Sequence, residues 1–358
     1  PFSNESTTVG APLLGAAVLA MVSLLLLTWA YARAETQILA TTEYTGFLWA
    51  ALFALSFEFA RVFKAYDYRT FFEKLIGKGW IVYEICFIVL LFLIMGVVGA
   101  ASGSILRDTM GIPPLVGSGL FLVCVAWLTY SGSQMIEIAL SWWSYVLYAV
   151  YIYFLYAGLS QFGGVISANF AAGTVKPGWA LGGFQYAFYN VAVTSTVLFS
   201  LNYLETRREA IISGIVASLI CVLPALFFYV VTIGFYPDVL NMEIPANAMI
   251  AKMGVRFLLP VWLIVLFGTM IETGVGFFHS INERINSAVL AKRGTGISKT
   301  TRGLVGIALT LMGLAISNFG LIGLIAKGYG TISWFFFILQ GVALFTIGIW
   351  KIKQHASV

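Results

Sequence analysis

The sequence predicts an all-α protein that crosses a membrane about ten times. Of its 358 residues, 60% are apolar and only 10% are charged, whereas a soluble domain carries roughly 25% charged residues. The apolar residues form runs of about 20, the length that an α-helix needs to cross the hydrocarbon core of a bilayer. The charged residues fall mainly between these runs, as expected for a polytopic membrane protein.

The expected membrane-spanning helices follow one another along the whole chain, separated by short connections. The second segment has the weakest signal because Glu58 and Arg61 interrupt it. The connections contain residues typical of turns, as in Gly111-Ile112-Pro113-Pro114 and Lys176-Pro177-Gly178. We expect helices at 11–32, 46–64, 79–102, 114–131, 138–160, 181–201, 209–234, 257–281, 303–325 and 331–350.

Two connections are expected to contain short helices of their own. Residues 66–72, after the second span, have the pattern of an interfacial helix, and residues 246–253 follow Pro245 with a helical pattern. Glycines interrupt the start of the first span (Gly10, Gly15) and of the sixth (Gly182, Gly183). Interrupted helices at corresponding positions of two halves are typical of inverted-repeat transporters. We therefore expect one transmembrane domain over residues 1–358, with repeats at about 11–160 and 181–352.

The distribution of basic residues predicts the orientation. With ten spans, one side of the membrane receives both termini and 14 of the 20 Lys and Arg residues. An excess of Lys and Arg marks the cytoplasmic side, so both termini are expected to be cytoplasmic. The same pattern assigns the net charge of +5 to membrane topology rather than to nucleic-acid binding. The expected partners are the lipid bilayer and a small molecule, and the sequence leaves the oligomeric state open.

The eighth span contains the most informative polar residue, Glu272. A charge near the bilayer centre costs at least about 2.5–3.5 kcal/mol on insertion scales, so its side chain must face a cavity or a partner. It is on one helical face with Thr269, Thr273, Gly276, Ser280 and Glu283. A carboxylate beside two hydroxyls can bind Na⁺, carry a proton or meet an amine. The alternative is a protonated carboxyl that hydrogen-bonds to a neighbouring helix.

The sixth span suggests a substrate contact. Tyr186, Asn190 and Thr194 follow at steps of four residues and share a helical face, with Tyr189 beside them. The Asn amide both donates and accepts hydrogen bonds, and Tyr supplies an amphipathic wall. Such a face suits a small polar solute, although hydrogen bonding between helices within the membrane is the structural alternative.

Four other polar residues lie in or near the expected spans. Glu58 and Arg61 are three residues apart and are expected to pair. Glu84, near the cytoplasmic end of the third span, is a candidate gate or relay residue, and His279 is either part of a proton path or structural. Interfacial positions are expected for the tryptophans near span ends, Trp142, Trp143, Trp179, Trp334 and Trp350.

Signals of an enzyme are missing from the sequence. It contains no phosphate-binding loop, HExxH, GxSxG, CxxC or CxxCH motif. Its two His residues are too few for a haem or copper relay of the usual kind. We therefore expect no enzymatic activity, no cofactor, and only Na⁺ or H⁺ as a coupling ion.

Several stretches resemble the YkvI-type bacterial membrane proteins. They are LFGTMIETGVGFFHSINER at 266–284, GLIGLIAKGYGTISW at 320–334, FEFARVFKAYDYRTFF at 57–72 and QYAFYN at 185–190. This family is grouped with the amino acid–polyamine–organocation superfamily, which implies a LeuT-like core of two inverted five-helix repeats. It further implies substrate near Tyr186 and Asn190, and a cation near Thr269, Glu272 and Thr273. Residues 10–32 depart from the Gly-rich first helix of the family.

These observations favour a secondary active transporter of the bacterial cytoplasmic membrane. The expected substrate is a small polar solute, such as an amino acid or a related amine or organic acid, moved by alternating access and coupled to Na⁺ or H⁺. An uncoupled channel or facilitator, and a scaffold or sensor subunit without transport activity, remain alternatives. The sequence leaves open the identity of the substrate and the direction of transport.

Overall fold

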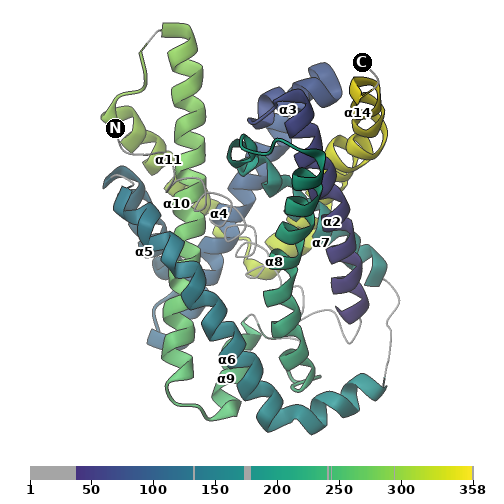
Figure 1. The fold of residues 1–358 in the computed structure, drawn as a ribbon. Helices are drawn as coiled ribbons and strands as arrows, with labels where there is room; N and C mark the ends of the chain where they lie inside the picture. The colour runs from purple at the N-terminus through teal and green to yellow at the C-terminus, as the bar shows by residue number, and fades with distance from the viewer. Residues whose placement is uncertain are drawn as a thin grey trace. The chain divides into compact units, whose positions relative to one another are not determined.

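The computed structural model describes residues 38–131, 134–172, 179–239, 242, 244–293 and 295–356 (Figure 1). Every regular element in these residues is a helix, which confirms the predicted all-α class. The first predicted span, 11–32, and its Gly10 and Gly15 lie outside the described residues. The chain is a multi-pass membrane protein.

The main helices correspond to the predicted spans. They are α2 (Ile38–Phe63), α4 (Trp80–Met110), α5 (Pro114–Ser131), α6 (Gln134–Ala172), α7 (Trp179–Val191), α8 (Arg207–Ile233), α10 (Leu258–Arg293) and α11 (Lys299–Ser317). A last helical stretch contains α12 (Leu321–Gly323), α13 (Gly330–Phe336) and α14 (Ile349–Ala356), joined by π-helical turns. Among the described residues, 7 helical stretches are long and apolar enough to cross a membrane, and α5 provides a shorter apolar helix at Pro114–Tyr130.

Both short helices predicted in the connections are present. Helix α3 (Tyr68–Ile76) follows α2, and α9 (Pro245–Met253) follows α8. The Asp67 side chain accepts a hydrogen bond of 2.8 Å from the Thr70 main-chain N–H, which satisfies a donor at the start of α3. Pro245 occupies the first turn of α9, where a missing N–H costs nothing.

The break in the sixth span is displaced from its predicted position. Gly182 and Gly183 lie inside α7, which stays α-helical from Trp179 to Val191, and the chain then forms 3₁₀ turns at Ala192–Thr196 and Leu198–Leu201. The prediction from the glycine pair was therefore wrong. The β-branched residues that follow Asn190, in the run VAVTSTV, are stiff at χ1 and favour the α-helix less.

Helix α10 is longer than the predicted eighth span. It continues to Arg293, through the first half of the connection expected at 282–302. A helix that extends beyond the hydrocarbon can continue through polar residues, because water and nearby hydrogen-bonding groups satisfy their side chains there. Asn286 shows this, since its Oδ1 accepts a hydrogen bond of 2.9 Å from the Ile297 N–H in the following turn.

The described helices belong to two compact units, and each takes segments from both predicted repeats. Unit 1 comprises Pro1–Ile88, Tyr151–Gly254 and Tyr329–Val358, and unit 2 comprises Val89–Val150 and Val255–Gly328. Close helix contacts in both units depend on glycine, as is common in membranes. In unit 1 a Cβ on Gly214 of α8 would lie 2.5 Å from the main-chain nitrogen of Ala54 in α2. In unit 2 a Cβ on Gly274 of α10 would lie 2.8 Å from Cγ1 of Val125 in α5.

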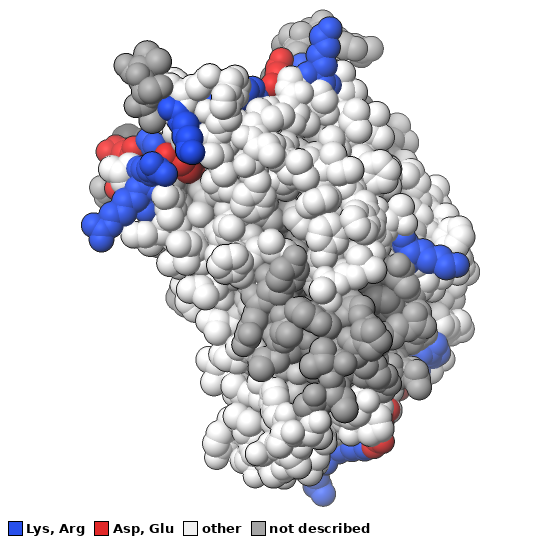
Figure 2. All heavy atoms as spheres, turned by 90° about the vertical axis from the view of Figure 1, so that its right-hand side faces the viewer, with Lys and Arg blue, Asp and Glu red and all other residues white. Residues whose placement is uncertain are grey.

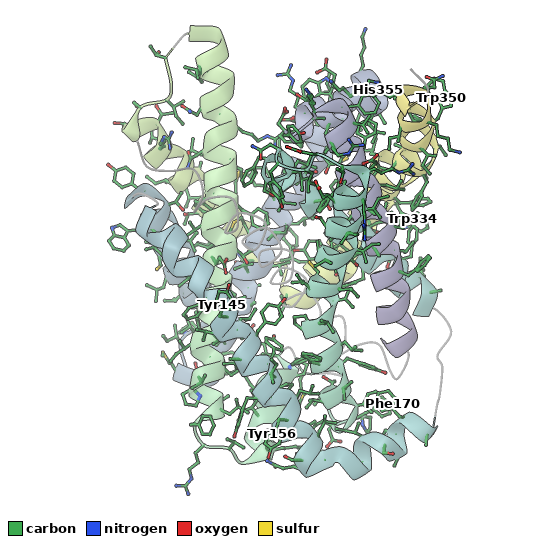
Figure 3. The ribbon with its side chains drawn as sticks, viewed as in Figure 1. Tyr145, Tyr156, Phe170, Trp334, Trp350 and His355 are labelled. Carbon is green, nitrogen blue, oxygen red and sulfur yellow. The ribbon has the colours of Figure 1, made fainter. Side chains whose placement is uncertain are left out.

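The surface is largely uncharged. On the face drawn in Figure 2, the Lys, Arg, Asp and Glu side chains that the structure describes lie near the margins, and the other described residues there are uncharged. Large apolar side chains are exposed along many helices, among them Trp127, Leu311 and Phe345. Tyr145 and Tyr156 project outward from α6 in Figure 3. Such a surface matches the hydrocarbon interior of a bilayer rather than water.

Candidate functional site

Within the described residues, each unit buries a cluster of polar side chains that the sequence singled out. In unit 1 the cluster surrounds the end of α7, and in unit 2 it lies along the middle of α10. The first contains Tyr186, Tyr189, Asn190 and Thr194, and the second contains Thr269, Glu272 and Thr273, so the two sets of predicted site residues are each brought together within a unit.

Asn190 and Thr194 expose no more than 2% of their surface. The Nδ2 of Asn190 donates a hydrogen bond of 2.9 Å to the main-chain carbonyl of Tyr186. A carbonyl only accepts hydrogen bonds, so the nitrogen of the Asn190 amide must be the atom that faces it. The Oδ1 atom of Asn190 takes no part in this bond. In the described residues neither this Oδ1 nor the Thr194 hydroxyl has a hydrogen-bond partner. Thr194 belongs to the 3₁₀ segment, so the predicted α-helical face extends only to Asn190.

The turn from α-helix to 3₁₀-helix frees main-chain carbonyls, and two side chains from distant segments bind them. Gln340 Nε2 donates to the Val191 carbonyl at 3.2 Å, and the Tyr83 hydroxyl, which also contacts the Ser195 hydroxyl, lies 3.2 Å from the Ala192 carbonyl. Gln340 and Tyr83 are fully buried. Neither residue was predicted from the sequence. An amide side chain inside an apolar run is the feature that could have indicated Gln340.

Aromatic rings line the same part of unit 1. The ring centroids of Trp49 and Tyr186 are 5.6 Å apart, those of Tyr186 and Tyr189 also 5.6 Å, and those of Tyr189 and Tyr329 4.7 Å. Trp49 also anchors α2 to α7, because its Nε1 donates to the Ala187 carbonyl at 3.0 Å. The predicted aromatic wall of the sixth span is thus a continuous row of rings from three segments.

In unit 2, Glu272 is almost fully buried, with 2% of its surface exposed. Neither of its carboxylate oxygens has a hydrogen-bond partner in the described part of the chain. Thr273 Oγ1 donates to the Thr269 carbonyl at 3.0 Å, which leaves the lone pairs of this hydroxyl free. A buried carboxylate without donors is unfavourable by several kcal/mol. The site therefore requires a proton, a cation or a donor group at Glu272.

The oxygens near Glu272 suit Na⁺ better than a transition metal. One carboxylate and two hydroxyls are hard oxygen ligands, which alkali and alkaline-earth cations prefer. The described residues contain no group of three His, Cys, Asp or Glu side chains that could hold a metal ion. The coupling-ion site at Thr269, Glu272 and Thr273 stays a prediction.

Trp143 is closely associated with this cluster. Its indole packs against Gly268, so closely that a Cβ there would lie 2.0 Å from Cζ2 of the ring. Its Nε1 donates to the Thr269 hydroxyl at 3.4 Å. Glycine leaves a flat helix surface that a large ring can cover, and the interfacial position of Trp143 stays a prediction. By contrast, Trp334 and Trp350 are exposed, as Figure 3 shows.

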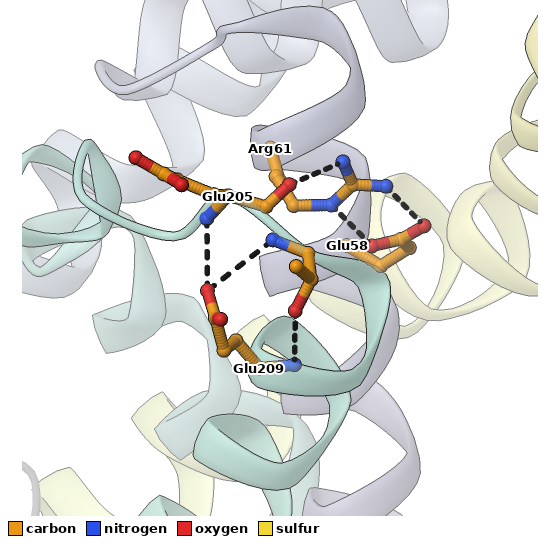
Figure 4. A network of polar contacts seen from close by, with 5 residues as sticks. Glu58, Arg61, Glu205 and Glu209 are labelled. Atoms are coloured by element: carbon orange, nitrogen blue, oxygen red, sulfur yellow. Dashed lines mark hydrogen bonds and ion pairs between the residues drawn. The ribbon is translucent and has the colours of Figure 1, made fainter.

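The predicted pair of Glu58 and Arg61 is confirmed. The Arg61 guanidinium donates to both carboxylate oxygens of Glu58 at 2.8 and 2.9 Å, and to the Glu205 carbonyl at 3.1 Å (Figure 4). Glu209 in turn accepts hydrogen bonds from the main-chain N–H groups of Glu205 and Thr206. This network ties the end of α2 to the start of α8, a structural role.

The structure places two other candidates without assigning them a function. The hydroxyl of Tyr68 in α3 donates to Glu84 Oε2 at 2.8 Å, so Glu84 is held at the start of α4 in unit 1. His279 lies on α10, and its side chain is outside the described residues. Their gate, relay or proton-path roles stay predictions.

Comparison with known proteins shows similarity in structure only. No family model and no curated protein matches the chain. MhsT in complex with L-phenylalanine has a TM-score of 0.59 at 18% identity, covering 94% of this chain and 87% of MhsT. The chain has the LeuT fold. A Na⁺-coupled sialic acid symporter in a substrate-bound outward-open state gives 0.63 at 15% identity, covering 95% and 78% of the two chains. Inward-facing Mhp1 gives 0.58 at 14%, covering 93% and 75%.

The shared fold confirms the predicted architecture of a LeuT-like helical membrane protein. At 14–18% identity these similarities concern the fold alone. Resemblance to the YkvI-type proteins stays a prediction, as do the cytoplasmic termini and the exact number of spans.

Proposed function

We propose that this protein is a secondary active transporter of a small polar solute in the cytoplasmic membrane of a bacterium. Two observations support this function. The fold is shared with a Na⁺-coupled symporter and with a protein that binds L-phenylalanine. The chain also buries polar atoms without partners in both units. Buried polar groups inside a membrane face cavities, ion paths or substrates.

The observation that carries the proposal is the buried carboxyl group of Glu272. A scaffold protein has no reason to keep both oxygens of a buried carboxyl free of donors, because the cost recurs in every folded molecule. A coupled transporter needs a group of this kind, which takes up Na⁺ or H⁺ from one side and releases it to the other. Thr269 and Thr273 complete the oxygen set when the ion is Na⁺.

We assign the solute to the cluster at the end of α7. Asn190 Oδ1 and the Thr194 hydroxyl supply hydrogen bonds, and Tyr186 and Tyr189 supply the apolar wall. Amino acids, related amines and organic acids all combine polar groups with an apolar part that such a surface accepts.

The test begins with a thermal-shift screen of the purified protein. The compounds are amino acids, amines and organic acids, each measured in Na⁺ and in K⁺ at two pH values. A ligand whose stabilisation depends on Na⁺ or on pH identifies both the substrate and the coupling ion. Uptake of that compound into proteoliposomes is then measured with and without the corresponding ion gradient.

The decisive variant is Glu272→Gln, which keeps shape and hydrogen bonding but has no titratable charge. We expect normal folding, loss of gradient-driven accumulation, and exchange at a rate similar to that of the wild type. Glu73→Gln, on the exposed face of α3, is the matched control and should accumulate solute normally. Concentrative uptake by Glu272→Gln at the wild-type level would contradict the assignment, and Glu84 would be the next candidate.

The same assay separates the alternatives. Solute flux through the wild-type protein that does not depend on any ion gradient indicates a channel or facilitator. A scaffold or sensor subunit is indicated if no compound stabilises the protein and if the Glu272→Leu and Asn190→Leu variants both function normally in cells.

A further inference from the structure

A basic surface in unit 1 lies where α2, α3 and α14 meet. Residues 64–80 and 349–356 contribute six Lys and Arg side chains against two acidic ones. They are Lys64, Arg69, Lys74, Lys78, Lys351 and Lys353, opposed by Asp67 and Glu73. Within the described residues none of the six lies in an ion pair. The surface therefore has an excess of positive charge, although Glu84 at the start of α4 interacts electrostatically with Arg69.

Two of these lysines are fixed in place by main-chain carbonyls rather than by carboxylates. Lys74 Nζ, in α3, donates to the Phe63 carbonyl at the end of α2 at 2.7 Å. Lys351 Nζ, in α14, donates to the carbonyl of Lys74 itself. Each ammonium group has three N–H donors and uses one in these bonds. The second contact joins the two residues as the Lys74–Lys351 pair, and each ammonium group keeps further N–H donors at the junction of α2, α3 and α14.

Six basic side chains gathered on one surface repel one another, and a bound anion reduces this repulsion. Lysine side chains also lose conformational freedom when they are fixed. Both costs are offset when one anion accepts hydrogen bonds from both ammonium groups. A phosphodiester suits this geometry because it combines a full negative charge with several acceptor oxygens.

The surroundings of the pair place it at the height of the lipid headgroups. The Arg69 guanidinium lies 4.5 Å from the centre of the Trp80 ring. Trp350, next to Lys351, is exposed, and the His355 ring lies 5.5 Å from that of Phe63 (Figure 3). Aromatic residues concentrate at the boundary between headgroups and hydrocarbon. Helix α3 also buries Phe71, Phe72 and Leu75 and exposes its charged face, as an interfacial helix does.

We propose that the Lys74–Lys351 pair binds the phosphodiester headgroup of an anionic phospholipid. The lipid bridges α3 and α14 and thereby fixes the end of α14 against α2. The site shares no residue with the polar clusters of α7 and α10, and it does not depend on the substrate of the protein.

The test uses the full-length protein in a neutral detergent. Thermal stability is titrated with phosphatidylglycerol, with phosphatidylcholine of the same acyl chains, and with inorganic phosphate. We expect phosphatidylglycerol to act at lower concentrations than phosphatidylcholine, and phosphate alone to have no effect. The substitution of both lysines, Lys74→Gln with Lys351→Gln, should weaken the phosphatidylglycerol response roughly 25-fold, because each basic residue near an anionic surface contributes about a factor of five.

Two further variants make the result interpretable. Lys252→Gln removes an exposed lysine that pairs with Asp238 at 2.7 Å, and it should leave the response unchanged. Lys74→Arg with Lys351→Arg keeps both charges and should retain the preference for phosphatidylglycerol. If the double Gln variant destabilises the protein, the single Lys351→Gln variant is used, with an expected weakening of about five-fold.

Three outcomes would overturn the proposal. If the double Gln variant responds to phosphatidylglycerol as the wild type does, the anionic lipid binds elsewhere. Equal responses to the two phospholipids would show that the headgroup charge is not recognised. A response to inorganic phosphate equal to that of the lipid would indicate a site for a soluble anion.

Discussion

Glu272, Asn190 and Gln340 each bury a polar oxygen that has no hydrogen-bond partner in the described residues. The two amides reach this state in the same way. Their nitrogens donate to main-chain carbonyls of α7, at Tyr186 and Val191, so their oxygens are the ends left over. At this scale the described residues combine buried amide oxygens in unit 1 with the buried carboxyl of Glu272 in unit 2.

Gly268 determines how closely Trp143 approaches the Glu272 cluster. The substitution Gly268→Ala puts a methyl group 2.0 Å from the indole, and the ring must move. We expect a loss of about 1–3 kcal/mol, the usual cost of overpacking, seen as a lower midpoint in thermal unfolding. Displacement of the ring should also shift the Trp143 fluorescence, measured against a Trp143→Phe reference.

Gly276, two turns further along α10, provides the matched control. A Cβ built there has no described atom within 4 Å. Gly276→Ala should therefore leave the unfolding midpoint unchanged or raise it slightly, because Ala favours the helix. Equal destabilisation by both substitutions would show that any side chain on this helix is harmful and that the contact with Trp143 is not the cause.

At the scale of elements, the central feature is the change of α7 into 3₁₀-helix after Val191. Two buried side chains hold the freed carbonyls, Tyr83 from α4 and Gln340 from the π-helical turn Phe337–Val342. Phe72 of α3 stacks on Tyr83 with ring centroids 3.5 Å apart, which fixes the hydroxyl. The break is therefore a defined structure supported by neighbouring helices.

Gln340→Leu removes the Nε2 donor and leaves the buried Val191 carbonyl without this hydrogen bond. We expect a destabilisation of about 1–3 kcal/mol, the cost of an unsatisfied buried polar group. The amides of residues 192–201 should exchange with deuterium faster than in the wild type, while α8 and α10 keep their protection. Hydrogen–deuterium exchange with mass spectrometry measures both segments in one experiment.

Thr346→Val is the control for this substitution. Thr346 is exposed and donates only within its own helix, to the Val342 carbonyl at 2.6 Å. Its exchange pattern at 192–201 should match the wild type. Faster exchange across the whole chain in Gln340→Leu, rather than at 192–201, would mean that Gln340 supports general stability and not the break.

At the scale of the whole molecule, the positions of charged residues are the basis of the predicted topology. The described helices include α3 and α9 at corresponding places, one after α2 and one after α8. Such correspondence agrees with the inverted repeat expected from the sequence. The excess of basic residues in alternate connections predicts that the α2–α4 and α10–α11 connections are cytoplasmic.

Cysteine labelling tests this orientation. In a background without the three native cysteines, Lys78→Cys and Thr295→Cys should be protected from an impermeant maleimide in intact cells, whereas Asp238→Cys should react. Lysis should expose all three. Labelling of Lys78→Cys and Asp238→Cys from the same side would exclude ten spans with cytoplasmic termini.

Local patterns predicted the helices well and their interactions less well. The spans, the short helices α3 and α9, and the Glu58–Arg61 pair depend on residues close in sequence, so hydropathy, caps and three-residue spacing reveal them. The break in α7 was misplaced because Gly182 and Gly183 are tolerated within a packed membrane helix. The contact of Trp143 with Gly268 was not predicted, because the two residues are more than a hundred positions apart in the sequence.

The residues of single segments were enough to predict a helical membrane protein with a carboxyl group, that of Glu272, inside an apolar helix. Both follow from the cost of placing polar groups in hydrocarbon, a cost that acts on each segment separately. The partners of those groups are visible only in the folded chain. Gln340 reaches Val191, Trp143 reaches Thr269 and Lys351 reaches Lys74 across long stretches of chain. Such contacts depend on how helices pack, and packing depends on side chains that local patterns leave unrelated.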